Sequence, residues 1–164
     1  MNLQAGCRKC DGCALCRDFL LESMIFKSHH NPKEYRVRED VTCTTNGIIY
    51  LISDTVCQRN CVGSTLLDMR SRWSNYKSHI KKNVRNCEIA SHFNDVNAHT
   101  CLQDTSNAKT YTNNLAKEIN VLIIEKVNYN KCKTKKEKLN ILAKREGYWQ
   151  TELRTMVRFG GLNV

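Results

Sequence analysis

Three short apolar runs in the later part of the chain predict the strands of a small sheet. The run "GIIYLIS" at 47–53 is rich in β-branched residues and has polar neighbours, which is typical of a buried strand. A loop at 54–60 separates it from "CVG" at 61–63, so residues 47–63 predict a β-hairpin. A third run, "EINVLIIEKV" at 118–127, is apolar on both faces, and we expect it to form the central strand.

A helical period of hydrophobic residues follows the hairpin at 66–82. Met69, Trp73, Tyr76 and Ile80 recur at spacings of four, three and four, which predicts an amphipathic helix with one buried face. The polar segment at 94–116 carries no such period, and we expect it to be irregular.

A second helix is predicted near the C-terminus, where Thr134 and Glu137 have the spacing of a capping box. Its apolar stripe consists of Leu139, Leu142, Ala143, Trp149, Leu153 and Met156. Glu146 falls within this stripe, and a buried carboxylate is costly unless it has a hydrogen bond, a partner or a metal. The spacing leaves two interpretations open: Glu146 belongs to a site, or it lies at the edge of the stripe and reaches water.

Residues 1–45 differ in pattern from residues 46–164, and we expect them to form a separate cysteine-rich element. The segment "EYRVREDVTC" at 34–43 alternates roughly and predicts one short strand. The chain contains no internal repeat and no low-complexity linker.

The charge balance favours a polyanionic partner. The 164 residues carry 26 Lys and Arg against 16 Asp and Glu, a net charge of +10, which favours nucleic acid over the alternative of a merely solvated basic surface. Aromatic residues make up only 7% of the chain, which argues against a broad base-stacking platform. No run approaches the ~20 apolar residues of a membrane span, so we expect a soluble, intracellular protein with no membrane partner.

Ten cysteines in a reducing compartment indicate metal binding. The densest group has three overlapping C-x2-C spacings and consists of Cys7, Cys10, Cys13 and Cys16. A structural zinc site needs four ligands in a tetrahedron, and four cysteines this close cannot readily all reach one ion. We therefore expect two or three of them to bind Zn²⁺ together with Cys43, or with His29 or His30 as the next candidates. Free thiols in a disordered tail are the alternative.

A second zinc site is a weaker hypothesis. Cys57 and Cys61 form a C-x3-C pair in the hairpin, and the ligands that would complete a site are Cys87 with His92, or His79. Lone cysteines on strands are more often small hydrophobic residues, so this alternative stays open.

The helix at 66–82 also carries candidate chemistry. Arg72 and Tyr76 lie four residues apart on one face, with His79 three residues further. A guanidinium beside a phenol or imidazole suits a phosphodiester, whereas the alternative is a core tyrosine beside a solvated basic face.

These segments together resemble a GIY-YIG nuclease domain, and most closely the endonuclease module of Penelope-like retroelements. The resemblance rests on the order of "GIIY", "CVGST", "RSRWSNY", "REGYWQTEL" and "GGLN". The upstream "CDGCALCRDFL" and the later "IASHFN" occur in the same order as in those modules. The resemblance implies an α+β fold, a small three-stranded antiparallel sheet flanked by helices, after an N-terminal cysteine-rich zinc-binding element.

The resemblance also implies roles for five residues. Tyr50 matches the tyrosine that helps activate water, and Arg72 matches the arginine that steadies the scissile phosphate. Tyr76 occupies a position where these modules usually have histidine. Glu146 matches the carboxylate that binds the divalent cofactor, Mg²⁺ or Mn²⁺, and Asn163 matches the terminal asparagine of the site.

Two positions depart from the family pattern. Cys61 stands at the second-motif tyrosine, and Asp54 stands where those modules have the first cysteine of the hairpin pair. A thiol is shorter than a phenol and a poor donor, and losing one oriented group costs roughly 10²- to 10⁴-fold in rate. The copy is then either decaying, or Cys61 joins Cys57 on a metal; the sequence leaves both open.

The function that these expectations describe is a DNA endonuclease, a nickase that opens a strand for target-primed reverse transcription. The implied partners are DNA, the reverse transcriptase domain of the same polyprotein and the element RNA, and the implied site of action is the nucleus. The chain would then be a domain excised from a longer polyprotein. The competing hypothesis is a zinc-stabilised nucleic-acid-binding module without turnover.

Overall fold

The computed structural model describes residues 4–95 and 118–164, so the predicted irregular segment at 94–116 lies almost wholly outside the described residues. The strands are β1 (Gly6–Arg8), β2 (Ile25–Ser28), β3 (Asn31–Arg36), β4 (Asp40–Thr42), β5 (Ile48–Asp54), β6 (Arg59–Thr65) and β7 (Ile119–Lys126). The helices are α1 (Ala14–Asp18), α2 (Met69–Lys82), α3 (Glu88–Asn94) and α5 (Lys135–Glu152), followed by the 3-10 turn η1 (Val157–Phe159). Within the described ranges, no helix is both long enough and apolar enough to cross a bilayer.

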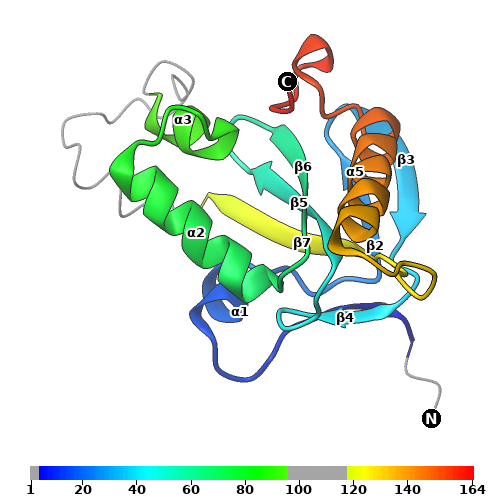
Figure 1. Ribbon diagram of the computed structural model, residues 1–164. Helices are drawn as coiled ribbons and strands as arrows, with labels where there is room; N and C mark the ends of the chain where they lie inside the picture. The colour runs from blue at the N-terminus through cyan, green and yellow to red at the C-terminus, as the bar shows by residue number, and fades with distance from the viewer. Residues whose placement is uncertain (1–3, 96–117) are drawn as a thin grey trace.

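The centre of the fold is a three-stranded antiparallel sheet in the order β6-β5-β7. Tyr50 in the middle of β5 pairs with Gly63 on β6 and with Ile123 on β7. Helices flank this sheet on both sides (Figure 1), so the expected α+β fold and the expected hairpin are confirmed. A long helix follows the hairpin as expected, although it begins at Met69 rather than at residue 66.

The expectation that β7 is the central strand was wrong, because β5 is central and β7 lies at the edge. The outer edge of β7 is covered by the N-terminal segment, where the Leu21 amide donates to the Val121 carbonyl (2.8 Å). The Val121 amide in turn donates to the Phe19 carbonyl (3.0 Å). A distant part of the chain thus satisfies backbone groups on the outer edge of this strand, as edge strands require.

The single strand expected at 34–43 is in fact two strands that pair with different partners. β3 forms an antiparallel hairpin with β2, whereas β4 pairs in parallel with β1. Val37 marks the division, because its side chain is buried and its amide donates to the Met24 carbonyl (2.9 Å) at the end of the hairpin. The alternation of side chains in the sequence thus continues from β3 into β4, although the two strands pair with different strands.

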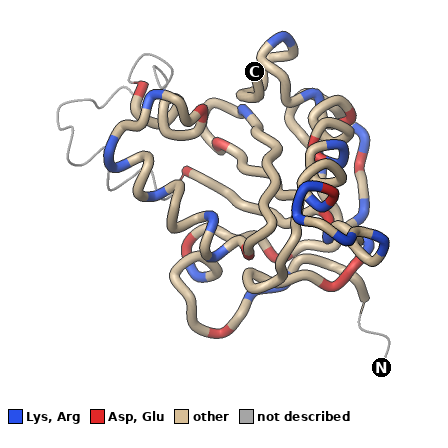
Figure 2. Tube along the Cα trace, in the orientation of Figure 1, with Lys and Arg blue, Asp and Glu red and all other residues tan. Residues whose placement is uncertain are grey.

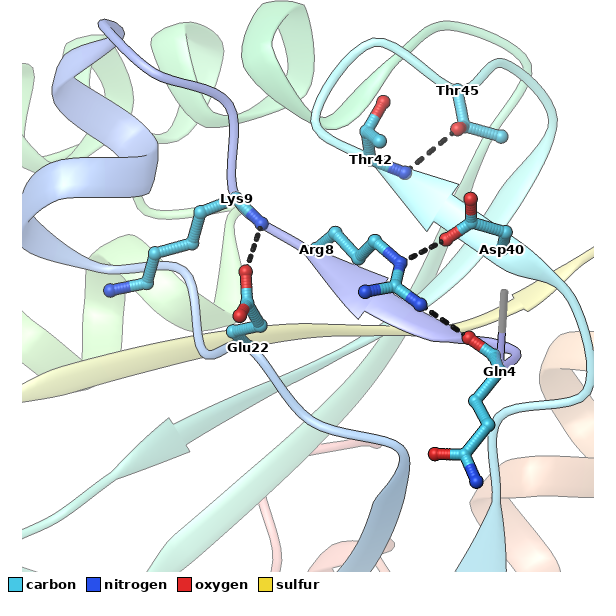
Figure 3. Close-up of polar contacts among 7 residues, drawn as sticks. All are labelled: Gln4, Arg8, Lys9, Glu22, Asp40, Thr42 and Thr45. Atoms are coloured by element: carbon cyan, nitrogen blue, oxygen red, sulfur yellow. Dashed lines mark hydrogen bonds and ion pairs between the residues drawn. The ribbon is translucent and has the colours of Figure 1, made fainter. Parts of the chain in front are cut away.

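Polar contacts secure the β1–β4 pair at the base of the molecule (Figure 3). The Arg8 guanidinium bonds the Asp40 carboxylate (2.7 Å), which joins the two strands through their side chains. The Lys9 amide donates to the Glu22 carboxylate (3.0 Å), which ties the end of β1 to the segment that leads into β2. These contacts are exposed, so they fix the register more than they add stability.

The two faces of the sheet are covered by different elements (Figure 1). Helices α2 and α3 lie on one side, where Trp73 packs against Phe19 with ring centroids 4.7 Å apart. Helix α5 and the β2–β3 hairpin lie on the other, where Trp149 makes edge contacts with Phe26 and Tyr35 (5.2 and 5.3 Å). Residues before β5 therefore pack against both helical layers.

The capping box of α5 is confirmed, but its apolar stripe is only partly buried. Leu142 and Trp149 are buried, whereas Leu139 and Ala143 are exposed. The contacts of α5 with the sheet and the β2–β3 hairpin include those of Arg145, Glu146 and Trp149, in the later turns of the helix.

We expect Thr134→Ala to lower the free energy of unfolding by about 1 kcal/mol, because the Glu137 amide loses its bond to the Thr134 hydroxyl. Urea denaturation measures this loss, and Thr44→Ala, an exposed position outside any helix, is the matched control. An unchanged midpoint for Thr134→Ala would show that the cap does not stabilise α5.

Candidate active-site cleft and metal-binding clusters

A cleft of about 290 Å³ opens at the outer edge of β6 and is lined by residues of β6, α2, α3 and α5. All six residues that the sequence singled out for phosphodiester chemistry line it: Tyr50, Cys61, Arg72, Tyr76, Glu146 and Asn163. Alternate residues of a strand face opposite sides of a sheet, so Gly63 faces α2 and Ser64 faces α5. The cleft therefore draws on both faces, which is how α2 and α5 contribute to one site.

The absence of a side chain at Gly63 allows Tyr50 to reach α2. A Cβ atom at this position would lie 2.5 Å from the Tyr50 Oη atom and 2.5 Å from its Cζ atom. The phenol therefore crosses β6 over its partner residue and enters the cleft. This explains physically why glycine stands here in the "CVGST" segment.

Tyr50, Arg72 and Tyr76 form a closed set of hydrogen bonds at the end of that path. The two phenol oxygens are 2.7 Å apart, and Arg72 Nε donates to the Tyr50 oxygen (3.0 Å) while Nη2 donates to the Tyr76 oxygen (3.3 Å). The Arg72 guanidinium also lies 4.6 Å from the Tyr76 ring centroid. The i, i+4 spacing on α2 thus brings the pair onto one face, as expected.

Burial keeps both phenols in their neutral form. The pKa of Tyr50 lies well above its ordinary value, first because the side chain is buried and then because Tyr76 lies beside it. Burial likewise raises the pKa of Tyr76. Near neutral pH both groups therefore act as hydroxyls that donate and accept hydrogen bonds.

Glu146 reaches the cleft from α5 and is held there by two side chains. The Ser64 hydroxyl donates to Oε2, and Gln150 Nε2 donates to Oε1 (3.0 Å). The carboxylate is half-buried and partnered, which explains a charge within an apolar stripe. Its oxygens and the Ser64 hydroxyl are hard donors of the kind that Mg²⁺ takes alongside water, so the donor set fits such an ion.

Glu88 at the start of α3 is a second carboxylate in the cleft. Burial raises its pKa, and the negative charge of Glu146 raises it further. The backbone amide of Val164 donates to it (3.4 Å), which brings the C-terminus to the mouth of the cleft.

Asn163 uses its whole amide group inside the fold. Its Oδ1 accepts from the Val62 amide (2.9 Å) and the Thr155 hydroxyl (2.7 Å). Its Nδ2 donates to the Val62 carbonyl (3.0 Å) and the Cys61 sulfur (3.4 Å). An amide offers two donors and two acceptor sites, and all four are engaged. Asn163 therefore acts on the cleft by fixing the C-terminal segment against β6.

Cys61 lies in the cleft wall as a buried thiol. Only 4% of its surface is exposed, and burial raises its pKa. Among the described residues, the metal-competent group that contains Cys57 does not include Cys61. The alternative in which Cys61 joins Cys57 on a metal is therefore not what the geometry favours.

Four cysteines gather with the geometry of a structural zinc site: Cys10, Cys13, Cys16 and Cys43. Their sulfur atoms all lie within 4.8 Å of one another, and those of Cys13 and Cys43 are 3.8 Å apart. A tetrahedron with Zn–S bonds of about 2.3 Å has edges of about 3.8 Å, so the set fits Zn²⁺. Three ligands from the dense group and one from Cys43 is the arrangement that the spacing favoured.

Cys7 lies outside this cluster. Its side chain is in β1 with 1% of its surface exposed, and burial raises its pKa to about 11. His29 and His30 are not part of the group either. The pKa of Cys10 is shifted in the opposite direction, because hydrogen bonds from the Gly12 and Cys13 backbone lower it to about 6.

A second group gathers at the end of the hairpin and consists of Asp54, Cys57 and His92. His92 Nε2 lies 2.8 Å from the Asp54 carboxylate, and both side chains are buried. The expected partners His79 and Cys87 line the cleft instead. The hairpin site thus uses the carboxylate at 54 with one expected cysteine and one expected histidine.

Sequence reasoning missed Ser64 and Gln150, which hold Glu146, and Asp54 as a member of the hairpin group. The i, i+4 spacing of Glu146 and Gln150 on a helix was a signal for the second of these. Asp54 had one signal, its place at the first cysteine of the family's hairpin pair. Ser64 depends on a contact across 82 residues of sequence, for which a single sequence gives no signal.

Comparison with known proteins gives a partial structural likeness. A mutant of the catalytic domain of intron endonuclease I-TevI aligns with a TM-score of 0.47 and 19% identity over 73% of this chain and 93% of that chain. A second structure of the catalytic domain of homing endonuclease I-TevI gives 0.43 and 18%, over 73% and 98%. No protein-family model and no curated protein matches the chain. The case for a function therefore rests on the residues of the cleft.

We expect the purified protein to hold zinc through the four-cysteine cluster, so Cys43→Ser should lose the ion. Cys7→Ser is the matched control, because it should keep the ion while losing stability from the core. Metal content measured after gel filtration decides this. Equal zinc loss in both variants would contradict the assignment of the ligands.

We expect Gly63→Ala to destabilise the protein by about 1–3 kcal/mol, because the new methyl group displaces Tyr50 from Arg72. Gly147→Ala is the control, since nothing lies within 4 Å of a Cβ there and an alanine stabilises a helix interior. Thermal denaturation should shift in opposite directions for the two variants. An unchanged melting temperature for Gly63→Ala would contradict the close approach of the Tyr50 ring to residue 63.

Proposed function

We propose that this chain is a metal-dependent DNA endonuclease domain with a GIY-YIG-like active site. The observation that carries the proposal is the convergence of Tyr50, Arg72, Tyr76 and Glu146 on one cleft at the edge of a three-stranded sheet. These residues come from β5, α2 and α5, and the ordered motifs of the sequence had matched them to one site.

The charge distribution suits a nucleic-acid substrate. Lys and Arg residues occur along α2 and α5 and at the turn before α5 (Figure 2), and both helices contribute residues to the cleft. The net charge of +10 makes DNA binding strongly salt-dependent, because each neutralised phosphate releases counterions. Part of this basic surface therefore serves to hold the DNA backbone rather than to read its sequence.

The residues of the cleft divide the work of hydrolysing a phosphodiester. Arg72 directs its guanidinium at the scissile phosphate, and its bonds to the two phenols hold it in place. Tyr50 and Tyr76 are neutral hydroxyls that accept a hydrogen bond from the attacking water and thereby orient it. Glu146, with Ser64, would hold Mg²⁺ or Mn²⁺, which supplies positive charge at the phosphate and the leaving oxygen.

Cys61 weakens this site without removing it. The thiol is buried and offers no positioned hydroxyl, so one of the oriented groups of the family is missing. We expect the rate to be lower by roughly 10²- to 10⁴-fold than with a tyrosine there. Tyr76 already places a phenol beside Tyr50 from α2, which is where the remaining activity would come from.

The finer assignment is a nickase that primes reverse transcription in a Penelope-like retroelement. It is supported by the order of the motifs and by the cysteine cluster before the nuclease residues. On this proposal residues 1–45 are a zinc-binding element and 46–164 the nuclease domain. The partners are the reverse transcriptase domain, DNA and the element RNA, and the site of action is the nucleus. A second Zn²⁺ at Asp54, Cys57 and His92 belongs to the same proposal.

A nucleic-acid-binding module without turnover is the second candidate function. Two observations favour it: Cys61 is a buried thiol, and the amide of Asn163 is fully engaged within the fold. Salt-sensitive DNA binding that is equal in the parent and in Glu146→Gln, with no cleavage by either, is the result that would establish it.

We expect the protein to nick supercoiled plasmid in Mg²⁺, and Glu146→Gln to lower the rate by at least about 10²-fold because the ion loses its carboxylate. Cys61→Tyr should raise the rate. Glu39→Gln, an exposed carboxylate before β4, is the control and should cut like the parent. Nicking that survives Glu146→Gln would place the chemistry outside this cleft.

A further inference from the structure

Arg70 connects the four-cysteine cluster to helix α2. Its Nη2 atom donates to the sulfur of Cys10 (3.6 Å) and to that of Cys43 (3.5 Å). Its own backbone amide donates to the Cys43 carbonyl (3.1 Å). One residue in the first turn of α2 therefore contacts two of the four sulfur atoms with its side chain and the cluster's backbone with its main chain.

This contact is electrostatically favourable once zinc is bound. A Zn²⁺ ion with four thiolates carries a net charge of about −2, and a guanidinium that donates to the thiolates offsets part of it. Groups that hydrogen-bond to metal ligands orient them and tune their affinity for the metal. Two backbone amides within the cluster also donate to sulfur, that of Cys10 to Cys16 (3.3 Å) and that of Cys16 to Cys13 (3.4 Å). Arg70, by contrast, donates to the cluster from α2.

The same turn of α2 leads directly to the cleft. Arg72 lies two residues after Arg70, and Tyr76 one turn further along the helix. The helix begins at its cap Asp68, whose carboxylate accepts from the Ser71 amide (2.7 Å). A displacement of this first turn would therefore move the Arg72 guanidinium relative to Tyr50, its partner on β5.

We propose that Arg70 is a positioning residue that couples the zinc cluster to the cleft, so that zinc fixes the start of α2 and with it Arg72. The inference rests on the proposed zinc site, and its effect on cleavage rests on the proposed function. Zinc binding at one end of the molecule then contributes to the geometry of the phosphodiester site, in addition to stabilising the N-terminal residues.

A direct contact between Arg70 and DNA is the competing explanation for a basic residue at this exposed position. The two roles predict different effects of an Arg70 substitution on zinc affinity and on DNA affinity. A coupling residue changes zinc affinity and the stability of α2 in the absence of DNA, whereas a phosphate contact changes DNA affinity alone.

The test compares the parent protein with Arg70→Ala, Arg70→Lys and the control Lys77→Ala, which removes one positive charge from the same helix. Zinc affinity is measured by competition with a chromophoric chelator. The stability of α2 is measured by amide hydrogen exchange of the zinc-loaded proteins. We expect Arg70→Ala to bind zinc about 10- to 100-fold more weakly and to speed exchange in the first turns of α2. Arg70→Lys should fall between, because it keeps the charge and loses the guanidinium.

The proposal would be overturned if Arg70→Ala and Lys77→Ala had the same zinc affinity and the same exchange rates in α2. If Arg70→Ala lost DNA affinity alone, Arg70 would be a DNA contact instead. If Arg70→Ala does not fold with zinc, Arg70→Gln supplies the same comparison. Both measurements are made without DNA, so they decide the coupling even if the parent never cuts plasmid. Where the parent does cut, Arg70→Ala should lower kcat more than it raises KM.

Discussion

The arrangement of the cleft depends on the close approach of Tyr50 to Gly63 across the central hairpin. Because residue 63 has no side chain, the Tyr50 phenol crosses β6 and meets Arg72 and Tyr76 of α2. The next residue, Ser64, then faces α5 and holds Glu146. One cross-strand pair thus determines which helix supplies the guanidinium and which supplies the carboxylate.

Buried polar groups around this pair are satisfied by one another, and this gives the site a defined shape. The phenols bond each other and Arg72, and the amide of Asn163 pairs with both backbone groups of Val62. Such a network is rigid when every member has a partner. The start of α2 also has a contact from outside the sheet, since Arg70 bonds two sulfur atoms of the N-terminal cysteine cluster.

The parts of the fold and of the cleft that depend on neighbouring residues could be predicted from the sequence. The β-branched run at 47–53, the i, i+4 pair of Arg72 and Tyr76, and the Thr134 capping box each carry their structure within a few residues. The failures were long-range. The strand at 118–127 looked central because it is apolar on both faces, and the segment that covers its edge lies about a hundred residues earlier in the sequence. The hairpin metal group likewise depends on a long-range contact, that of Asp54 with His92. Which three of the four clustered cysteines join Cys43 was also open, and Cys7 is left out because β1 turns its side chain into the core.

The central claim is that a divalent ion binds at Glu146, in the cleft at the edge of β6 that Arg72 also lines. The most direct measurement is paramagnetic broadening of amide and side-chain resonances when Mn²⁺ is added to the zinc-loaded protein. We expect the strongest broadening at Ser64 and Gln150, the two neighbours that bond the Glu146 carboxylate, and its loss in Glu146→Gln. Broadening centred elsewhere, or unchanged in Glu146→Gln, would contradict the account.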